Sequence, residues 1–303
     1  MLALLISTCL FPHKLAAQQA QQLSDDPTAI CQREQEKESA VVRGFVFKTY
    51  EDDIEDPACL QVFHDGKVVF REAESAKHYY LGQPAERKWK IPFIENGRDV
   101  TGRGHPDMIV SQWSGGAHCC TTHYVFELEP DFKLIATIDD RDYSVAHFER
   151  DDGHYIYKTA DWTFAYWPSC FACSPSTQVV LRFTSQNGGG FHLALDKMKR
   201  PRPTKAEWEG KLREVQKVLS DEGPQVEIGR TQWQFVLDLI YSGHSDLAWK
   251  FLDDTGPKAQ AGDLPKLAEF CSIFMESPYW PDIAPTLLNA PPECSNAIPK
   301  SSE

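Results

Sequence analysis

The stretch THYVFELEPDFKLIATI, residues 122–138, contains the pattern that decides the fold. Its first half places apolar side chains at every second position, at Tyr124, Phe126 and Leu128. Such an alternation is typical of an antiparallel strand with one face in the core and one in solvent. A turn signal at 129–131 then precedes a second apolar run. The stretch therefore predicts two antiparallel strands joined by a turn.

Similar short runs, rich in Val, Ile, Tyr and Phe, occupy residues 41–196 and are separated by turn residues. Asp99–Leu134 and Asp151–Leu193 share one order of loops and strands at an offset of about 50 residues, the size of a propeller-blade unit. The alternative is that unrelated hairpins share this order by chance. Because two or three units cannot close a propeller, we expect a mostly antiparallel β domain with propeller-blade-like repeats, arranged as an open sheet or a sandwich.

The chain becomes helical after KMKRPRPTK, residues 197–205, which we interpret as an interdomain linker. Thr204 and Glu207 have the spacing of a capping box at a helix start. We expect a small helical domain at 206–285 and a Cys- and Pro-containing tail at 286–303.

Residues 237–254, LDLIYSGHSDLAWKFLDD, predict an αα-hairpin inside this helical domain. Gly243 suits the end of the first helix, and Ser245 can cap the second. A β domain followed by a helical domain gives the fold class α+β.

The N-terminal residues 1–17 have the features of a cleaved signal peptide. Their apolar core of about ten residues is too short to span a bilayer. Residues 18–40 form a polar, Gln-rich leader. We therefore expect a periplasmic or secreted protein with no transmembrane segment in the mature chain.

Composition narrows the class of partner. The 303-residue chain is 42% hydrophobic and 25% charged, which is ordinary for a folded soluble protein. Its formal net charge of −13 argues against nucleic acid and anionic membrane surfaces, because both require basic patches. The partners that remain are a protein, a peptide or a glycan.

The cysteines indicate disulfides, because eight remain after signal cleavage and an even number in an exported chain favours pairing. Sequence order favours Cys31–Cys59 near the start and Cys271–Cys294 in the tail. The eight are Cys31, Cys59, Cys119, Cys120, Cys170, Cys173, Cys271 and Cys294.

The central four cysteines permit two interpretations. In an oxidising compartment, Cys119 or Cys120 would bridge Cys170 or Cys173 and fasten neighbouring repeats. The alternative is a Zn or Cu cluster of His118, Cys119, Cys170 and Cys173, because imidazole and thiolate ligands suit these metals. A redox CxxC of the thioredoxin type is disfavoured, because Cys170 lies in a strand–loop context.

The segment DVTGRGHPD, residues 99–107, has the spacing of a calcium loop. It is similar to the loop of FG-GAP/VCBS-type repeats in integrin-like propellers. The resemblance implies calcium held between two strands of a blade, with Asp99, Thr101, His105 and Asp107 at the ligand positions.

Arg103 departs from that pattern by placing a cation where the loop requires a carboxylate. We expect its guanidinium to pair with Asp99 or Asp107 in place of the ion. The expectation is therefore no cofactor, with calcium as the alternative.

The aromatic strip DWTFAYWPSCF, residues 161–171, is a second candidate surface. Trp162, Tyr166 and Trp167 could form a platform for sugars or peptides. The alternative is that alternating aromatic side chains belong to the core.

Segments such as PDMIVSQWSGGAHCC and DWTFAYWPSCFACSPSTQVVL resemble a group of uncharacterised exported bacterial proteins over most of residues 90–285. The resemblance implies architecture and compartment, but no activity. We expect a non-catalytic binding or structural protein of unknown ligand, stabilised by disulfides. The alternative is a metal-dependent, hydrolase-like enzyme with its site around His118, Cys119 and Cys120.

Overall fold

The computed structural model describes residues 31–32, 35–51, 58–73, 78–116, 119–141, 145–167, 170–186, 189–220, 225–255 and 267–295. The expected signal peptide at 1–17 and residues 18–30 of the expected leader lie outside these ranges.

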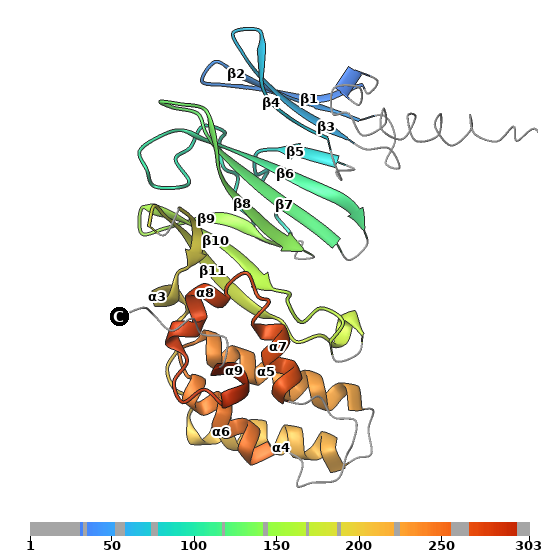
Figure 1. The fold of residues 1–303 in the computed structure, drawn as a ribbon, viewed down its shortest axis with the longest axis vertical. Coiled ribbons are helices and arrows are strands. Elements are labelled where there is room, and N and C mark those ends of the chain that lie inside the picture. The colour runs from blue at the N-terminus through green and yellow to red at the C-terminus, as the bar shows by residue number, and fades with distance from the viewer. Residues whose placement is uncertain are drawn as a thin grey trace, which may run out of the picture.

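The β part comprises, in the described residues, three four-stranded antiparallel sheets. The first sheet is β1-β2-β3-β4, the second β5-β6-β7-β8 and the third β12-β11-β10-β9, so strands that follow one another in the chain pair, and no sheet closes on itself. Figure 1 shows the sheets stacked, with the helices beyond the third. The strands are β1 (Glu36–Val42), β2 (Phe45–Tyr50), β3 (Cys59–His64), β4 (Lys67–Glu72), β5 (His78–Leu81), β6 (Asp107–Gly116), β7 (Cys119–Glu127), β8 (Lys133–Arg141), β9 (His147–Asp151), β10 (His154–Asp161), β11 (Thr177–Thr184) and β12 (Gly190–Leu193).

Strand β1 begins inside the segment that we expected to be a leader. Its residues are mostly exposed, so their composition gives no apolar signal. Polar contacts attach it instead: Lys48 Nζ lies 2.7 Å from Glu36 Oε2, and the Leu81 amide donates to Glu38 Oε2 at 3.2 Å.

The second sheet packs against a hydrophobic core on each of its faces. Val125 and Phe126 are neighbours on β7 and both are 0% exposed. Phe126 packs in a core shared with the first sheet, whereas Val125 packs in a core shared with the third sheet and the helices. The expectation of a solvent-facing side in residues 122–138 is therefore wrong for β7, because another sheet covers that side.

The two segments with a common order of loops and strands take equivalent places in neighbouring sheets. Asp99–Leu134 contains β6, β7 and the start of β8, and Asp151–Leu193 contains β10, β11 and β12. Each therefore supplies the last three strands, in chain order, of its four-stranded sheet.

The helical part continues the core of the third sheet. Phe164, in the loop after β10, stacks on Phe270 with ring centroids 4.9 Å apart, and Trp167 meets Trp233 at 5.4 Å. Among the described residues, no helix combines the length and apolar character needed to cross a bilayer. The helices are α3 (Leu195–Met198), α4 (Lys205–Ser220), α5 (Gln225–Tyr241), α6 (Ser245–Thr255), α7 (Leu267–Phe274), α8 (Trp280–Ile283) and α9 (Pro292–Ser295), with 3₁₀ turns η1 (Phe171–Cys173) and η2 (Ala284–Thr286).

Helices α5 and α6 form the αα-hairpin that the sequence predicts. Gly243 lies in the turn between them with φ of 85°, a left-handed conformation that glycine adopts without steric cost. The α4 start has the expected capping box, since the Thr204 amide donates to Glu207 Oε2 at 2.7 Å and the Glu207 amide donates to Thr204 Oγ1 at 3.3 Å. The fold class is therefore α+β with mostly antiparallel sheets.

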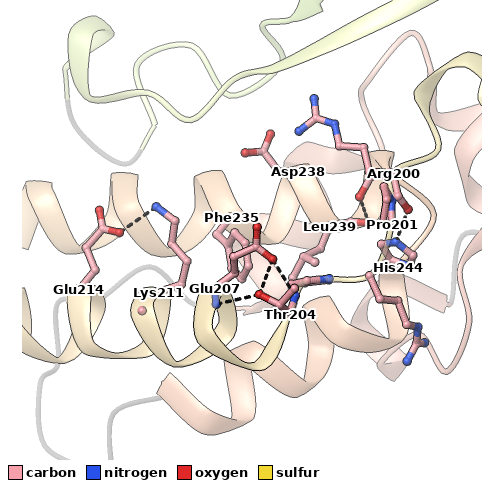
Figure 2. Close-up of a pocket in the computed structure, with 14 residues that line it drawn as sticks. Arg200, Pro201, Thr204, Glu207, Lys211, Glu214, Phe235, Asp238, Leu239 and His244 are labelled. Atoms are coloured by element: carbon pink, nitrogen blue, oxygen red, sulfur yellow. Dashed lines mark hydrogen bonds and ion pairs between the residues drawn. The ribbon is translucent and has the colours of Figure 1, made fainter.

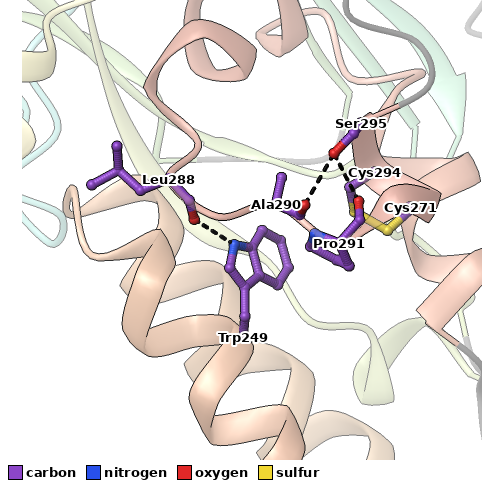
Figure 3. Close-up of a disulfide and its surroundings, with 7 residues drawn as sticks. All are labelled: Trp249, Cys271, Leu288, Ala290, Pro291, Cys294 and Ser295. Atoms are coloured by element: carbon purple, nitrogen blue, oxygen red, sulfur yellow. Dashed lines mark hydrogen bonds between the residues drawn. A yellow bond between two sulfur atoms is a disulfide. The ribbon is translucent and has the colours of Figure 1, made fainter.

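The tail is fastened to the helices by the Cys271–Cys294 disulfide (Figure 3). Nearby, the Trp249 indole donates to the Leu288 carbonyl at 3.0 Å, and Ser295 Oγ donates to the Ala290 carbonyl at 3.0 Å.

The expected Cys31–Cys59 pair is also present. The expectation that Cys170 or Cys173 bridges to the hairpin at 119–120 is wrong, because these two cysteines bond to each other. The single turn η1 places their Cα atoms 5.0 Å apart, within the range for a disulfide.

Candidate functional site

A groove lies between the segment at 199–204 and the helices α4 and α5 (Figure 2). Its volume is about 820 Å³, which is within the range of small-molecule sites. Pro201, Pro203, Phe235 and Leu239 supply apolar lining, and charged side chains surround them.

Backbone and capping contacts fix the wall formed by residues 199–204. His244 Nε2 lies 2.8 Å from the Arg200 carbonyl, which ties this segment to the α5–α6 turn. At its other end, the capping box joins Thr204 to the first turn of α4. Between them, Pro201 and Pro203 have fixed φ and restrict the residues that precede them to extended conformations. The wall is therefore in place without a ligand.

Two of the three cationic side chains in the lining are neutralised by carboxylates. Lys211 Nζ lies 2.7 Å from Glu214 Oε2, and Arg202 forms an ion pair with Asp246. In the described part of the chain, the guanidinium of the third, Arg200, forms no ion pair or hydrogen bond. Arg200 is therefore the lining cation that is open to a ligand anion.

The Arg200 side chain extends toward Asp238 in Figure 2, and the charges of the two groups interact. Burial raises the pKa of Asp238, while hydrogen bonds from Thr177 and Gln234 and the charges of Arg200 and Lys211 oppose the shift. Thr177 Oγ1 donates to Asp238 Oδ1 at 2.8 Å. Asp238 is thus held by its own neighbours, and burial makes its negative charge costly.

The groove was missed by sequence reasoning. Residues 197–205 were interpreted only as a linker, although α3 already occupies their beginning. The one available signal was the basic and Pro-rich composition of this segment beside a helix pattern that carries Asp238 among apolar residues.

The calcium-like loop holds its acids by internal hydrogen bonds. Asp107 Oδ2 accepts from the amides of Val100 at 2.9 Å and Thr101 at 3.0 Å and from Thr101 Oγ1 at 2.9 Å. Asp99 accepts from the amides at 103 and 104 at 3.0 and 2.8 Å. Burial raises the pKa of Asp107 to about 6, partly offset by the bonds from Thr101 and Val100.

The prediction that the Arg103 guanidinium pairs with Asp99 or Asp107 is wrong. Its Nη1 lies 3.1 Å from Glu127 Oε2 at the end of β7, and not beside Asp99 or Asp107. Glu127 is 1% exposed, so a buried carboxylate attracts the guanidinium more than the loop acids, whose oxygens already accept amide hydrogens. Asp99, Thr101 and Asp107 do lie together, whereas His105 joins none of the hydrogen bonds described above. No group of three His, Cys, Asp or Glu residues suited to a metal occurs within the described ranges.

Two ligands of the alternative Zn or Cu cluster are in a disulfide in this structure. Cys170 and Cys173 are bonded to each other, and a disulfide sulfur is not a thiolate ligand. Cys120, one of the two cysteines of the alternative enzyme site, is also in a disulfide. His118 and the side chain of Cys119 lie outside the described residues.

The aromatic strip divides between core and surface. Trp167 is 7% exposed and packs among the helices, which agrees with the alternative that it belongs to the core. Tyr166 is 58% exposed, and Trp162 stacks on Phe171 with ring centroids 4.9 Å apart.

A polar network between the second and third sheets was also missed. Ser111 Oγ lies 2.8 Å from His123 Nδ1, and His123 Nε2 lies 2.7 Å from Asp140 Oδ2. Tyr157 of the third sheet donates to the same oxygen. Burial raises the pKa of Tyr157, and the charge of Asp140 adds to this shift. We interpret this chain of bonds as a fastening between two sheets.

Comparisons of the chain with family models, curated proteins and solved structures gave no match. The fold and the groove define the protein as an α+β protein with a partly apolar groove at its helical end.

Proposed function

We propose that this is an exported, non-catalytic binding protein. Its ligand has an apolar body and one anionic group, and it occupies the groove between residues 199–204 and helices α4 and α5. The observation that carries the proposal is the Arg200 guanidinium, which lacks an ion-pair partner in the described residues and lies at a partly apolar groove of about 820 Å³.

The lining favours a ligand of this chemistry. Phe235, Leu239 and the two prolines offer apolar surface, whose burial contributes roughly 25 cal/mol per Å². A guanidinium binds a carboxylate or a sulfonate through two parallel hydrogen bonds, which are stronger than bonds between neutral groups. The ion pairs of Lys211 and Arg202 leave Arg200 as the preferred anion site.

Asp238 adds a dependence on pH. Its carboxylate repels a ligand anion at Arg200, and burial already favours its protonated form. Since the approaching anion raises the pKa of Asp238 further, binding takes up a proton. We therefore expect affinity to increase as the pH falls through the range in which Asp238 titrates.

We assign the sheets a structural role. The disulfides Cys31–Cys59 and Cys271–Cys294, together with the expected signal peptide, support export to an oxidising compartment. The four-stranded meanders support blade-like repeats, in which the loop at 99–107 is a calcium loop that has lost its ion. The helical end would then present the groove on a stacked β scaffold.

The fluorescent probe 1-anilinonaphthalene-8-sulfonate, an aromatic body with one sulfonate, tests the groove. We expect saturable binding to the wild type and a loss of about 10- to 100-fold in affinity for Arg200→Gln, because a bond to a charged group contributes roughly 1.5–3 kcal/mol. The control Arg213→Gln removes an exposed cation of α4 and should bind like the wild type. Equal affinity of Arg200→Gln and the control, with unchanged circular dichroism, would refute the proposal.

A further inference from the structure

We propose that the Cys170–Cys173 disulfide is a redox-active site that exchanges with the thiols of a partner protein. The site is a partly exposed cystine in a single turn beside the exposed Tyr166 and the half-buried Trp162 and Phe171. It lies apart from the groove lining, and the proposal is independent of the proposed function.

This disulfide differs in exposure from Cys31–Cys59 and Cys271–Cys294. Cys170 is exposed and Cys173 is half-buried. By contrast, Cys59, Cys271 and Cys294 are fully buried and Cys31 nearly so. Thiol–disulfide exchange requires in-line access of a thiolate to a sulfur, so exposed disulfides are the labile and catalytic ones.

It also differs in the length of chain that it closes. The cysteines are 3 residues apart here, against 28 in Cys31–Cys59 and 23 in Cys271–Cys294. Because a disulfide restrains the unfolded chain more as its loop lengthens, opening this one shifts the folding equilibrium about 20- to 30-fold less than opening either of the others. Reduction of Cys170–Cys173 is therefore compatible with the folded state.

The turn is held by bonds that do not need the disulfide. The Cys173 amide donates to the Cys170 carbonyl at 3.0 Å, and Ser174 Oγ donates to the same carbonyl at 3.1 Å. Ser174 Oγ also accepts from the Tyr166 amide at 2.7 Å. The two sulfurs thus stay close after reduction, which allows the bond to form again.

Aromatic side chains provide a contact surface next to the sulfurs. Phe171, between the two cysteines, stacks on Trp162 and meets the Tyr166 ring at 5.5 Å. Tyr166 is 58% exposed and has a backbone φ of 65°, an uncommon conformation for a residue with a side chain. Amphipathic, exposed aromatic residues of this kind are enriched where proteins bind one another.

The exchange between the partner dithiol and the Cys170–Cys173 disulfide proceeds in two steps. A thiolate of the partner attacks the Sγ of Cys170, the more exposed residue of the pair. The Cys170–Cys173 bond breaks, and Cys173 leaves as a thiolate that takes up a proton. In the second step, the other thiolate of the partner attacks the partner sulfur that is bonded to Cys170. A disulfide forms within the partner, and Cys170 is released as a thiolate that takes up a proton. Two electrons and two protons pass from a partner dithiol to the cysteine pair, and the number of disulfides is unchanged.

The first test measures selective opening. The full oxidised chain is equilibrated in glutathione buffers of increasing reducing power, alkylated and analysed by peptide mass spectrometry. We expect Cys170 and Cys173 to be alkylated while Cys31–Cys59 and Cys271–Cys294 stay oxidised and the circular dichroism is unchanged. Opening of Cys170–Cys173 together with Cys31–Cys59 and Cys271–Cys294, or opening only with loss of structure, would overturn the proposal.

The second test measures transfer to a protein dithiol, with reduced ribonuclease A as the probe. We expect the wild type to remove about two thiols per chain from the probe and the double variant Cys170→Ser/Cys173→Ser to remove none above background. Tyr166→Ala should slow transfer to ribonuclease A but leave the opening by glutathione unchanged. Equal transfer by the wild type and the double variant contradicts the assignment. The double variant should still bind the anilinonaphthalene probe, which separates this result from the groove.

Discussion

Asp107 makes the stability of the folded chain depend on pH. Burial raises the pKa of its carboxyl from 3.8 to about 6, and hydrogen bonds from Thr101 and Val100 offset only part of this shift. Between these values the folded chain holds a proton that the unfolded chain has lost, so the free energy of unfolding falls as the pH rises from about 4 to about 6. The difference between a pKa of 3.8 and a pKa of about 6 corresponds to a loss of about 3 kcal/mol in the free energy of unfolding at neutral pH.

The substitution Asp107→Asn isolates this effect. The amide retains an oxygen for the bonds from residues 100 and 101 but does not titrate. Urea unfolding of both proteins, followed by circular dichroism in buffers with a chelator, gives the stability of the wild type relative to the variant at each pH. We expect this difference to fall by up to about 3 kcal/mol between about pH 4 and about pH 7.

The control is Asp131→Asn, which removes an exposed carboxylate and should show no such dependence. A difference between wild type and Asp107→Asn that is constant with pH, or that rises with it, would refute the reasoning. A rise would mean that the loop stabilises the carboxylate, as an ion site does.

Other parts of the structure give further expectations. Calcium should leave the melting temperature unchanged, because Arg103 stands at a ligand position of the loop at 99–107; a large saturable rise would contradict this. Tyr241→Phe should lower stability by about 1.5–3 kcal/mol in urea unfolding, because its hydroxyl donates to buried Asp161 at 2.6 Å. Phe164→Ala should cost about 3–5 kcal/mol and shift the far- and near-ultraviolet transitions together, because the third sheet and the helices share one core; separate transitions would disprove this.

The sequence pattern predicted a strand or helix well where the signal comes from residues within that same element. The alternation at Tyr124, Phe126 and Leu128 and the cap at Thr204 depend on neighbours in sequence, so the sequence contains the information. Burial of the second face of β7 depends on a sheet formed some 30 residues later, which the same pattern does not report.

The candidate site was harder to predict, because its residues converge only in the folded chain. The sequence places Asp99 and Asp107 nearest to Arg103, yet the guanidinium pairs with Glu127 on a strand brought alongside by folding. Likewise, the whole of α4 and most of α5 separate Arg200 from Asp238 in the chain. Charge balance in the groove, which singles out Arg200, cannot be derived from spacing.

The position of a bound ligand tests the central claim most directly. Amide chemical shifts of the isotope-labelled chain, recorded by TROSY NMR during titration with 1-anilinonaphthalene-8-sulfonate, locate the binding surface. The account predicts that the largest saturable changes fall at residues 199–204 and around Phe235 and Leu239, and that Arg200→Gln abolishes them. Changes centred on Trp162, Tyr166 and Phe171, or spread over the three sheets, would contradict a ligand site in the groove.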